Sequence, residues 1–155
     1  MGMEVDYDAF KADKRSREPT RMQTTARKAA IQKWIAQAIA DNIIRPSTAP
    51  AWSQIMLTPK PNGTWRFAMD YRAINKYTKA SRAPIPNIKR LLSTIGKHSP
   101  RLFAKMDLTS GFYQTPLEEG AMKYTAFDTD CGLYEFTQAS MGLLNSPWYF
   151  GISKV

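Results

Sequence analysis

Residues 65–72 alternate between apolar and polar side chains, the pattern of a β-strand that buries one face. The apolar face consists of Trp65, Phe67, Met69 and Tyr71, and the other face of Arg66, Ala68, Asp70 and Arg72. Before this run stands Asn62-Gly63, a dipeptide that tolerates positive φ at both central positions of a tight turn. Upstream of the turn, Ile55 and Leu57 alternate with polar partners. The sequence therefore predicts an antiparallel hairpin with one greasy face.

The charge of the chain is strongly positive. It has 22 Lys and Arg against 13 Asp and Glu, a formal net charge of +9, and such a field attracts polyanions, of which nucleic acid is the commonest. Basic residues crowd residues 11–28, a pattern most often found in solvated tails. The remainder recurs through the body, and Arg66 and Arg72 would suit phosphate groups if their face is concave. The charge thus favours a nucleic-acid partner.

Two helices are predicted from apolar spacing. Ile31, Ile35, Ile39 and Ile43 recur every four residues and predict a helix with one apolar stripe that ends before residue 45. A second, shorter helix is expected to turn its apolar residues inward and to stop near Gly96; these residues are Ile88, Leu91, Leu92 and Ile95. Residues 1–22 are polar, basic and without periodicity, which predicts a flexible arm. Helices and antiparallel strands together indicate an α+β fold.

Several classes of protein are disfavoured. A single Cys131 and a single His98 permit neither a disulfide within the chain nor a Cys/His zinc site, which fits an intracellular location, cytoplasmic or nuclear. No apolar run approaches the roughly 18 residues of a membrane span. The first thirty residues are charged and lack the apolar core of a secretory signal. We therefore expect no membrane partner and no secretion.

Asp107 is the first candidate for catalytic chemistry. Residues 102–108 read as a strand on which Phe103, Lys105 and Asp107 share one side, so the carboxylate stands at the exit of the strand. An aspartate before a Ser-Gly turn is most often a turn former. Taken alone, this position does not predict catalysis.

Seven motifs, in the same order, resemble the reverse transcriptases of gypsy-type long-terminal-repeat retrotransposons. They cover residues 43–47, 62–75, 84–86, 106–114, 125–127, 132–136, and 142–143 with 145–147. The resemblance implies the fingers and an incomplete palm of a right-hand polymerase, truncated before the second catalytic motif. It implies the following division: a flexible basic arm at 1–22, fingers at 23–82 and 115–143, a palm segment with the first catalytic motif at 83–114, and the start of a truncated palm helix at 144–155.

The same resemblance implies the metal chemistry. In this family two magnesium ions, for which manganese can substitute, assist nucleotidyl transfer from deoxynucleoside triphosphates to a primer on an RNA or DNA template. Asp107 matches the first metal-binding, catalytic aspartate, and the backbone carbonyl of Leu108 matches its usual oxygen partner. The second motif of the family contains two adjacent aspartates, and no such pair occurs here. We expect this chain alone to be inactive and to bind no metal tightly.

Further site residues follow from the resemblance. Lys60 and Arg66 match positions that reach the incoming triphosphate, and Phe112 matches the aromatic ring that excludes a 2′-hydroxyl. The positions expected to meet template and primer are Met141, Gly142, Asp70 and Arg72. The family usually has proline and phenylalanine before the glycine, where this chain has Ser140-Met141.

Two other classes of function stay open beside the polymerase fragment. One is a non-catalytic module that binds single-stranded nucleic acid, with Trp52, Trp65 and Tyr71 stacking on bases unless these rings belong to the core. The other is a protein-interaction module that self-associates through exposed palm surface.

Overall fold

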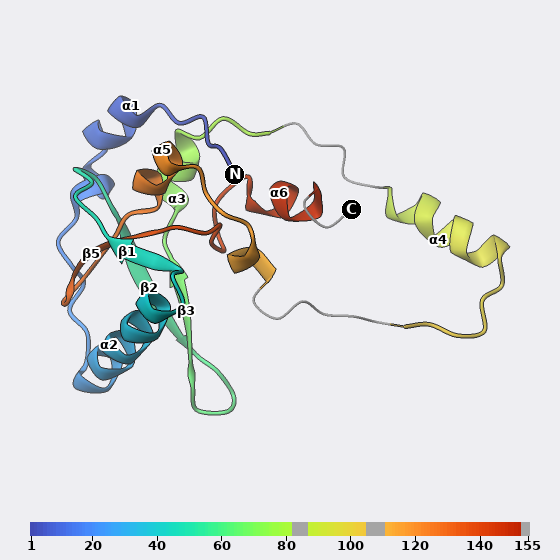
Figure 1. Cartoon of the computed structure of the whole chain (residues 1–155), viewed down its shortest axis with the longest axis horizontal. Coiled ribbons are helices and arrows are strands. Elements are labelled where there is room, and N and C mark those ends of the chain that lie inside the picture. The colour runs from blue at the N-terminus through green and yellow to red at the C-terminus, as the bar shows by residue number, and fades with distance from the viewer. Residues whose placement is uncertain (82–86, 105–110, 153–155) are drawn as a thin grey trace.

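A computed structural model describes residues 1–81, 87–104 and 111–152 of the chain. Within these ranges, five strands form one sheet in the order β1-β5-β4-β2-β3 (Figure 1). The strands are β1 (Ile44–Pro46), β2 (Ser53–Pro59), β3 (Trp65–Met69), β4 (Phe127–Thr129) and β5 (Gly132–Phe136). Helices and this single open sheet confirm the predicted α+β class.

The sheet joins two distant stretches of the chain. β2 and β3 form the predicted antiparallel hairpin, with Ile55 opposite Met69 and Pro59 opposite Trp65. β4 and β5 form a second hairpin, and β5 also pairs with β1. The two hairpins meet where β2 runs parallel to β4. The strands on either side of residues 83–114 thus share one sheet, and the division into fingers and palm stays a prediction.

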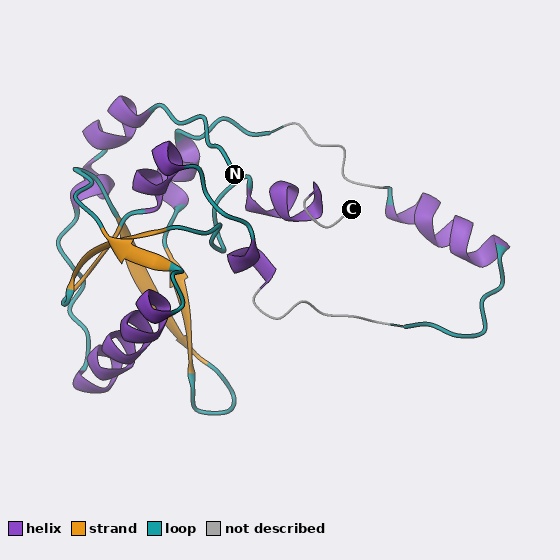
Figure 2. Ribbon diagram, in the orientation of Figure 1, coloured by secondary structure: helices purple, strands orange, loops and turns teal. Residues whose placement is uncertain are grey.

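Several helical segments lie close to this sheet, and α4 (Ile88–Lys97) stands apart from it (Figure 2). The helical segments are α1 (Tyr7–Ala12), η1 (Lys14–Arg17), α2 (Thr25–Ala40), α3 (Arg72–Lys76), α4 (Ile88–Lys97), η2 (Gly111–Gln114), α5 (Glu119–Met122), η3 (Lys123–Thr125) and α6 (Ser146–Ile152). α2 begins after Thr24, whose side chain accepts a hydrogen bond from the Arg27 N–H. Trp34 of α2 stacks on Phe67 of β3, with ring centroids 5.0 Å apart. α2 therefore packs directly on the hairpin.

The apolar stripe of α2 is largely confirmed. Ile31, Ile35 and Ala38 are buried, whereas Ile39 is 41% exposed and Ile43 follows the end of the helix. Behind the stripe, Phe127 and Phe136 are fully buried, with ring centroids 5.3 Å apart. Part of the core lies between α2 and the sheet because both elements present their apolar faces there.

The turn between β2 and β3 differs from the expected tight turn. The loop spans residues 60–64, and only Gly63 adopts positive φ, at 77°. The Gly63 N–H donates to the Lys60 carbonyl, and the Thr64 hydroxyl donates to Asn62 Oδ1. Asn62 therefore closes the loop through its side chain and does not adopt a left-handed backbone.

The flexible arm predicted for residues 1–22 is corrected by the structure. The segment forms α1 and η1, and the Asp6 side chain caps α1 by accepting from the Ala9 N–H. Phe10 is 1% exposed and packs against Tyr77. Charged residues dominate the composition of this segment, but it also contains a few apolar side chains. Burial of these side chains is sufficient to dock the segment.

The inward orientation predicted for the helix at 88–97 is also wrong. α4 forms and is capped by Asn87, yet Ile88 and Leu92 are 68% and 62% exposed. In Figure 1 α4 lies well away from the sheet. Gly96 is not its stop, since the helix continues to Lys97. Residues 102–104 form no strand, and the rest of the strand predicted at 102–108 lies outside the described residues.

Candidate nucleic-acid interface

The tip of the β2–β3 hairpin carries two of the predicted site residues. Lys60 is the first residue after β2, and Arg66 lies on β3 opposite Thr58. Both residues are exposed. Figure 1 shows this hairpin extending beyond the other strands, so both residues lie where an anionic ligand has free access. Their assignment to the triphosphate remains a prediction.

A fixed ion pair marks the other end of β3. The Asp70 carboxylate accepts two hydrogen bonds from Arg72, at 2.7 Å from Nε and 2.6 Å from Nη2. The Arg72 guanidinium holds the pKa of the Asp70 carboxyl below its usual range, so this group is ionised at neutral pH. The Asp70 side chain is 11% exposed and that of Arg72 is 73% exposed. The carboxylate thus orients a guanidinium whose outer edge faces solvent.

The predicted glycine turn packs against the same end of β3. Gly142 has φ of 97°, and a Cβ added there would lie 3.5 Å from the Tyr71 ring and 3.6 Å from the Met69 carbonyl oxygen. Asn75 of α3 donates from Nδ2 to the Gly142 carbonyl at 2.8 Å. Its Oδ1 accepts from the Leu144 N–H at 2.9 Å. One amide therefore holds both sides of the turn.

Asn75 is the last residue of the motif at 62–75, and the sequence predicts no role for it. An asparagine side chain both donates and accepts, so it can satisfy a carbonyl and an N–H of one turn together. This capacity to donate and accept together was the signal in the sequence that could have indicated a role for Asn75. The partner turn lies 67 positions away in the chain, and no local pattern indicated it.

The buried ring of Tyr71 packs against the Gly142 turn. Tyr71 is 2% exposed, its hydroxyl donates to the Thr125 carbonyl at 3.1 Å, and it accepts from Ser140 Oγ at 3.2 Å. Burial raises the pKa of the Tyr71 phenol, which stays neutral. The suggestion that Tyr71 stacks on bases is therefore wrong, because its ring belongs to the core. Ser140, where the family usually has proline, is used here as a donor to this phenol.

Of the remaining predicted residues that the structure describes, Met141 adjoins this cluster and Phe112 lies in a separate element. Met141 is 54% exposed beside the glycine. Phe112 lies in η2, where its carbonyl accepts from the Thr115 N–H, and the adjacent Tyr113 stacks on Phe136. Asp107 and Leu108 lie outside the described residues. The structure thus gathers Asp70, Arg72, Met141 and Gly142 at one end of β3, and Lys60 and Arg66 occupy the other.

Two absences hold for the described ranges. No three His, Cys, Asp or Glu side chains gather there as a metal site. No helix in those ranges is long and apolar enough to cross a bilayer.

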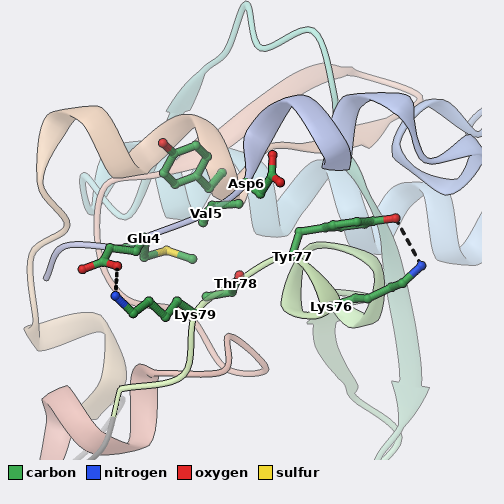
Figure 3. Close-up of a pocket in the computed structure, with 9 residues that line it drawn as sticks. Glu4, Val5, Asp6, Lys76, Tyr77, Thr78 and Lys79 are labelled. Atoms are coloured by element: carbon green, nitrogen blue, oxygen red, sulfur yellow. Dashed lines mark hydrogen bonds and ion pairs between the residues drawn. The ribbon is translucent and has the colours of Figure 1, made fainter.

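A cavity of about 690 Å³ lies between the N-terminal segment and the residues that follow α3 (Figure 3). Val5 forms a bridge with Thr78, and Lys79 Nζ lies 2.7 Å from a Glu4 carboxylate oxygen. The cavity is lined by none of the predicted site residues. Because Glu4 and Lys79 pair with each other across the cavity, we assign it to the docking of the N-terminal segment.

Comparison with known proteins decides the family. Residues 58–153, more than half of the chain, match the family model "Reverse transcriptase (RNA-dependent DNA polymerase)". The chain belongs to the reverse transcriptase family. The matched region includes Arg66, Asp70, Asp107 and Gly142.

The curated relatives are retrotransposon polyproteins. The Retrovirus-related Pol polyprotein from transposon 412 of Drosophila melanogaster is 38% identical over 123 residues, 76% of this chain and 10% of the relative. That from transposon opus, also of D. melanogaster, is 38% identical over 125 residues, 77% of this chain and 12% of the relative. The Tf2-3 polyprotein of Schizosaccharomyces pombe is 32% identical over 121 residues, which are 78% of this chain and 9% of the relative. The chain spans about a tenth of these relatives and is a fragment of a reverse transcriptase domain.

Solved structures show the same fold. Native prototype foamy virus protease-reverse transcriptase has a TM-score of 0.75 at 25% identity, over 92% of this chain and 19% of that one. The foamy viral protease-reverse transcriptase in complex with double-stranded DNA has a TM-score of 0.73 at 26% identity, over 92% of this chain and 29% of that one. The complex of the foamy viral protein with an RNA/DNA hybrid has a TM-score of 0.72 at 26% identity, over 91% of this chain and 19% of that one. These likenesses confirm the α+β fold, which is consistent with a fingers and palm fragment of a polymerase.

Proposed function

We propose that this chain forms the fingers and the first part of the palm of an RNA-directed DNA polymerase from a gypsy-type long-terminal-repeat retrotransposon. The parent reaction is transfer of deoxynucleotides to a primer paired with an RNA or DNA template. The observation that carries the proposal is the cluster at the end of β3, where Arg72 is fixed by Asp70 and the Gly142 turn is held by Asn75. This cluster lies within the region that matches the family model.

Each predicted residue has a physical role in this proposal. Arg72 offers an oriented guanidinium to a template phosphate, and the bare Gly142 lets a sugar or base approach the backbone closely. Lys60 and Arg66 extend from the hairpin tip toward the triphosphate of the incoming nucleotide. Phe112 would lie against its sugar. These assignments follow the family pattern and await direct tests.

The proposed metal ligands also suit the metal by their chemistry. A carboxylate at Asp107 and a backbone carbonyl at Leu108 are hard oxygen donors, which magnesium prefers. When bound, magnesium or manganese would neutralise charge on the phosphates and activate the primer hydroxyl. We propose catalysis only for the parent enzyme, since the family pattern also requires an adjacent pair of aspartates.

Binding to nucleic acid tests this proposal directly. We expect the 155-residue chain to bind a fluorescent template–primer duplex with a single-stranded overhang, and its dissociation constant to rise steeply with salt. The reason is release of counterions, because a strand loses about 0.7 to 0.9 ions for each phosphate neutralised. Anisotropy titrations from low to physiological salt give the slope. Polyglutamate of matched length is the control competitor. Binding that is undetectable, or independent of salt, would contradict the proposal.

Self-association is the second candidate function, and α4 supports it. Its apolar residues Ile88, Leu91 and Leu92 are each at least half exposed, as are Leu102 and Phe103 nearby in sequence. Exposed apolar area of this kind favours association. We expect the apparent mass in size-exclusion chromatography to rise with concentration, and Leu92→Glu to reduce that rise. A monodisperse monomer at every concentration removes this candidate.

A further inference from the structure

A second cavity, of about 200 Å³, lies beside the cluster at the end of β3. Its polar lining comes from three separate parts of the chain: Arg15, Glu18 and Arg21, then Ser53 and Gln54, then Asp70 and Arg72. Arg15 belongs to η1 and Arg21 to the loop before α2, so both come from the segment that the sequence predicted to be a flexible arm. Packing of that segment creates this cavity.

The charges around the cavity favour an anion. Three arginines line it against two carboxylates, those of Glu18 and Asp70. Asp70 is committed to Arg72 at 2.6 Å and lies 3.7 Å from Arg21 Nη2, so it orients two guanidiniums at once. Within the described parts of the chain, the Arg15 side chain has no salt-bridge partner. Positive side chains thus outnumber negative ones in the lining of the cavity.

Two neutral polar residues, Ser53 and Gln54, also line the cavity, and they differ in their hydrogen bonding. The Gln54 side chain donates to the Glu18 carbonyl at 2.8 Å and accepts from the Arg21 N–H at 3.3 Å, which fixes the loop that carries the arginines. Ser53 is 3% exposed, and its N–H donates to the Ala126 carbonyl. The Ser53 hydroxyl has no partner in the described structure. A buried hydroxyl without a partner is unfavourable, and a ligand that accepts its hydrogen bond would explain it.

We propose that this cavity binds one phosphate group of single-stranded nucleic acid, with Arg15 and Arg21 as its charged donors and Ser53 as a neutral donor. The site deepens the proposed function and rests on it, because it adjoins Arg72 at the end of β3. No aromatic side chain lines the cavity, so stacking on a base is not available there. Arginine forks recognise phosphate oxygens whatever the base sequence, so binding at this site is independent of sequence.

Three matched substitutions test the site. Arg15→Gln and Arg21→Gln each remove one charge from the cavity, and Lys33→Gln removes one charge from the exposed surface of α2. We expect either arginine variant to weaken binding of a single-stranded oligonucleotide about tenfold or more at low salt, as loss of a hydrogen bond to a charged group implies. Each arginine variant should also lower the salt slope by about 0.7, the value for one phosphate on a single strand. Lys33→Gln should change affinity less than twofold.

Ser53→Ala separates a ligand contact from a structural one. Removal of a hydroxyl that has no protein partner should leave the thermal midpoint unchanged or raise it. The same substitution should weaken oligonucleotide binding about threefold to fivefold if the hydroxyl donates to phosphate. Unchanged affinity overturns the assignment of Ser53, and a lowered midpoint with unchanged affinity indicates a purely structural role.

The outcomes distinguish this site from the proposed function. If the unaltered chain shows no salt-dependent binding, both are overturned. If it binds, but Arg15→Gln and Arg21→Gln behave like Lys33→Gln, the site alone is overturned. Titration with a deoxynucleoside triphosphate is the second arm. Arginine variants that weaken triphosphate binding and leave oligonucleotide binding unchanged would assign the cavity to the free nucleotide and overturn the proposal of a strand.

Discussion

Replacement of Tyr71 with alanine is expected to lower the free energy of unfolding by about 3–5 kcal/mol, as for other aromatic residues removed from a core. Its ring is 2% exposed and lies under the Gly142 turn, and its hydroxyl bonds to the Thr125 carbonyl and Ser140. The substitution therefore creates a cavity and leaves two buried polar groups without a partner. Urea denaturation gives the change from the midpoint, provided that the slope stays constant.

Tyr71→Phe isolates the contribution of the hydroxyl. It keeps the ring, so we expect a loss of about 1–3 kcal/mol from the unsatisfied partners alone. Tyr134→Phe is the matched control, because the Tyr134 hydroxyl bonds to the Cys131 carbonyl at an exposed position. The control should change stability by less than about 0.5 kcal/mol. Equal losses in the two variants would show that the buried bonds of Tyr71 contribute nothing specific.

Gly142→Ala is expected to lower the free energy of unfolding by about 1–2 kcal/mol, the cost of a left-handed conformation for a residue with a Cβ. The φ of 97° requires this conformation. The added Cβ would lie 3.5 Å from the Tyr71 ring, which is ordinary van der Waals contact, so the loss comes from the backbone and not from a clash. Gly142→Val should lose more, since β-branched residues tolerate positive φ least. Denaturation by urea measures both.

Gly120→Ala is the matched control for this prediction. Gly120 lies in α5 with open space around its Cα, and its φ is not positive. Alanine there should raise stability by up to about 1 kcal/mol through helix propensity. A Gly142→Ala variant as stable as the unaltered chain would mean that the turn relaxes freely. The Asn75 hydrogen bonds would then not hold it in place.

The sequence by itself determined the elements that depend on neighbouring residues. The alternation in residues 65–72 predicted β3 and its buried face, because side chains alternate strictly along a strand, although β3 ends at Met69 and α3 begins at Arg72. The four-residue spacing of isoleucines predicted α2 and its buried stripe for the corresponding reason. The order of the seven motifs indicated a reverse transcriptase, which the comparisons confirm, and the gypsy-type assignment stays a prediction. The metal-binding role of Asp107 stays a prediction from sequence.

Only the tertiary structure decided which distant residues meet. Docking of Phe10, the parallel pairing of β2 with β4, and the Asn75 contact with the Gly142 turn all join residues far apart in the chain. Periodicity identifies the apolar face of a segment. It does not show which distant segment will bury that face. α4 demonstrates the reverse, since its amphipathic spacing is correct and its apolar face remains exposed. A local pattern fixes the conformation of a segment, but its burial depends on surfaces that distant segments supply.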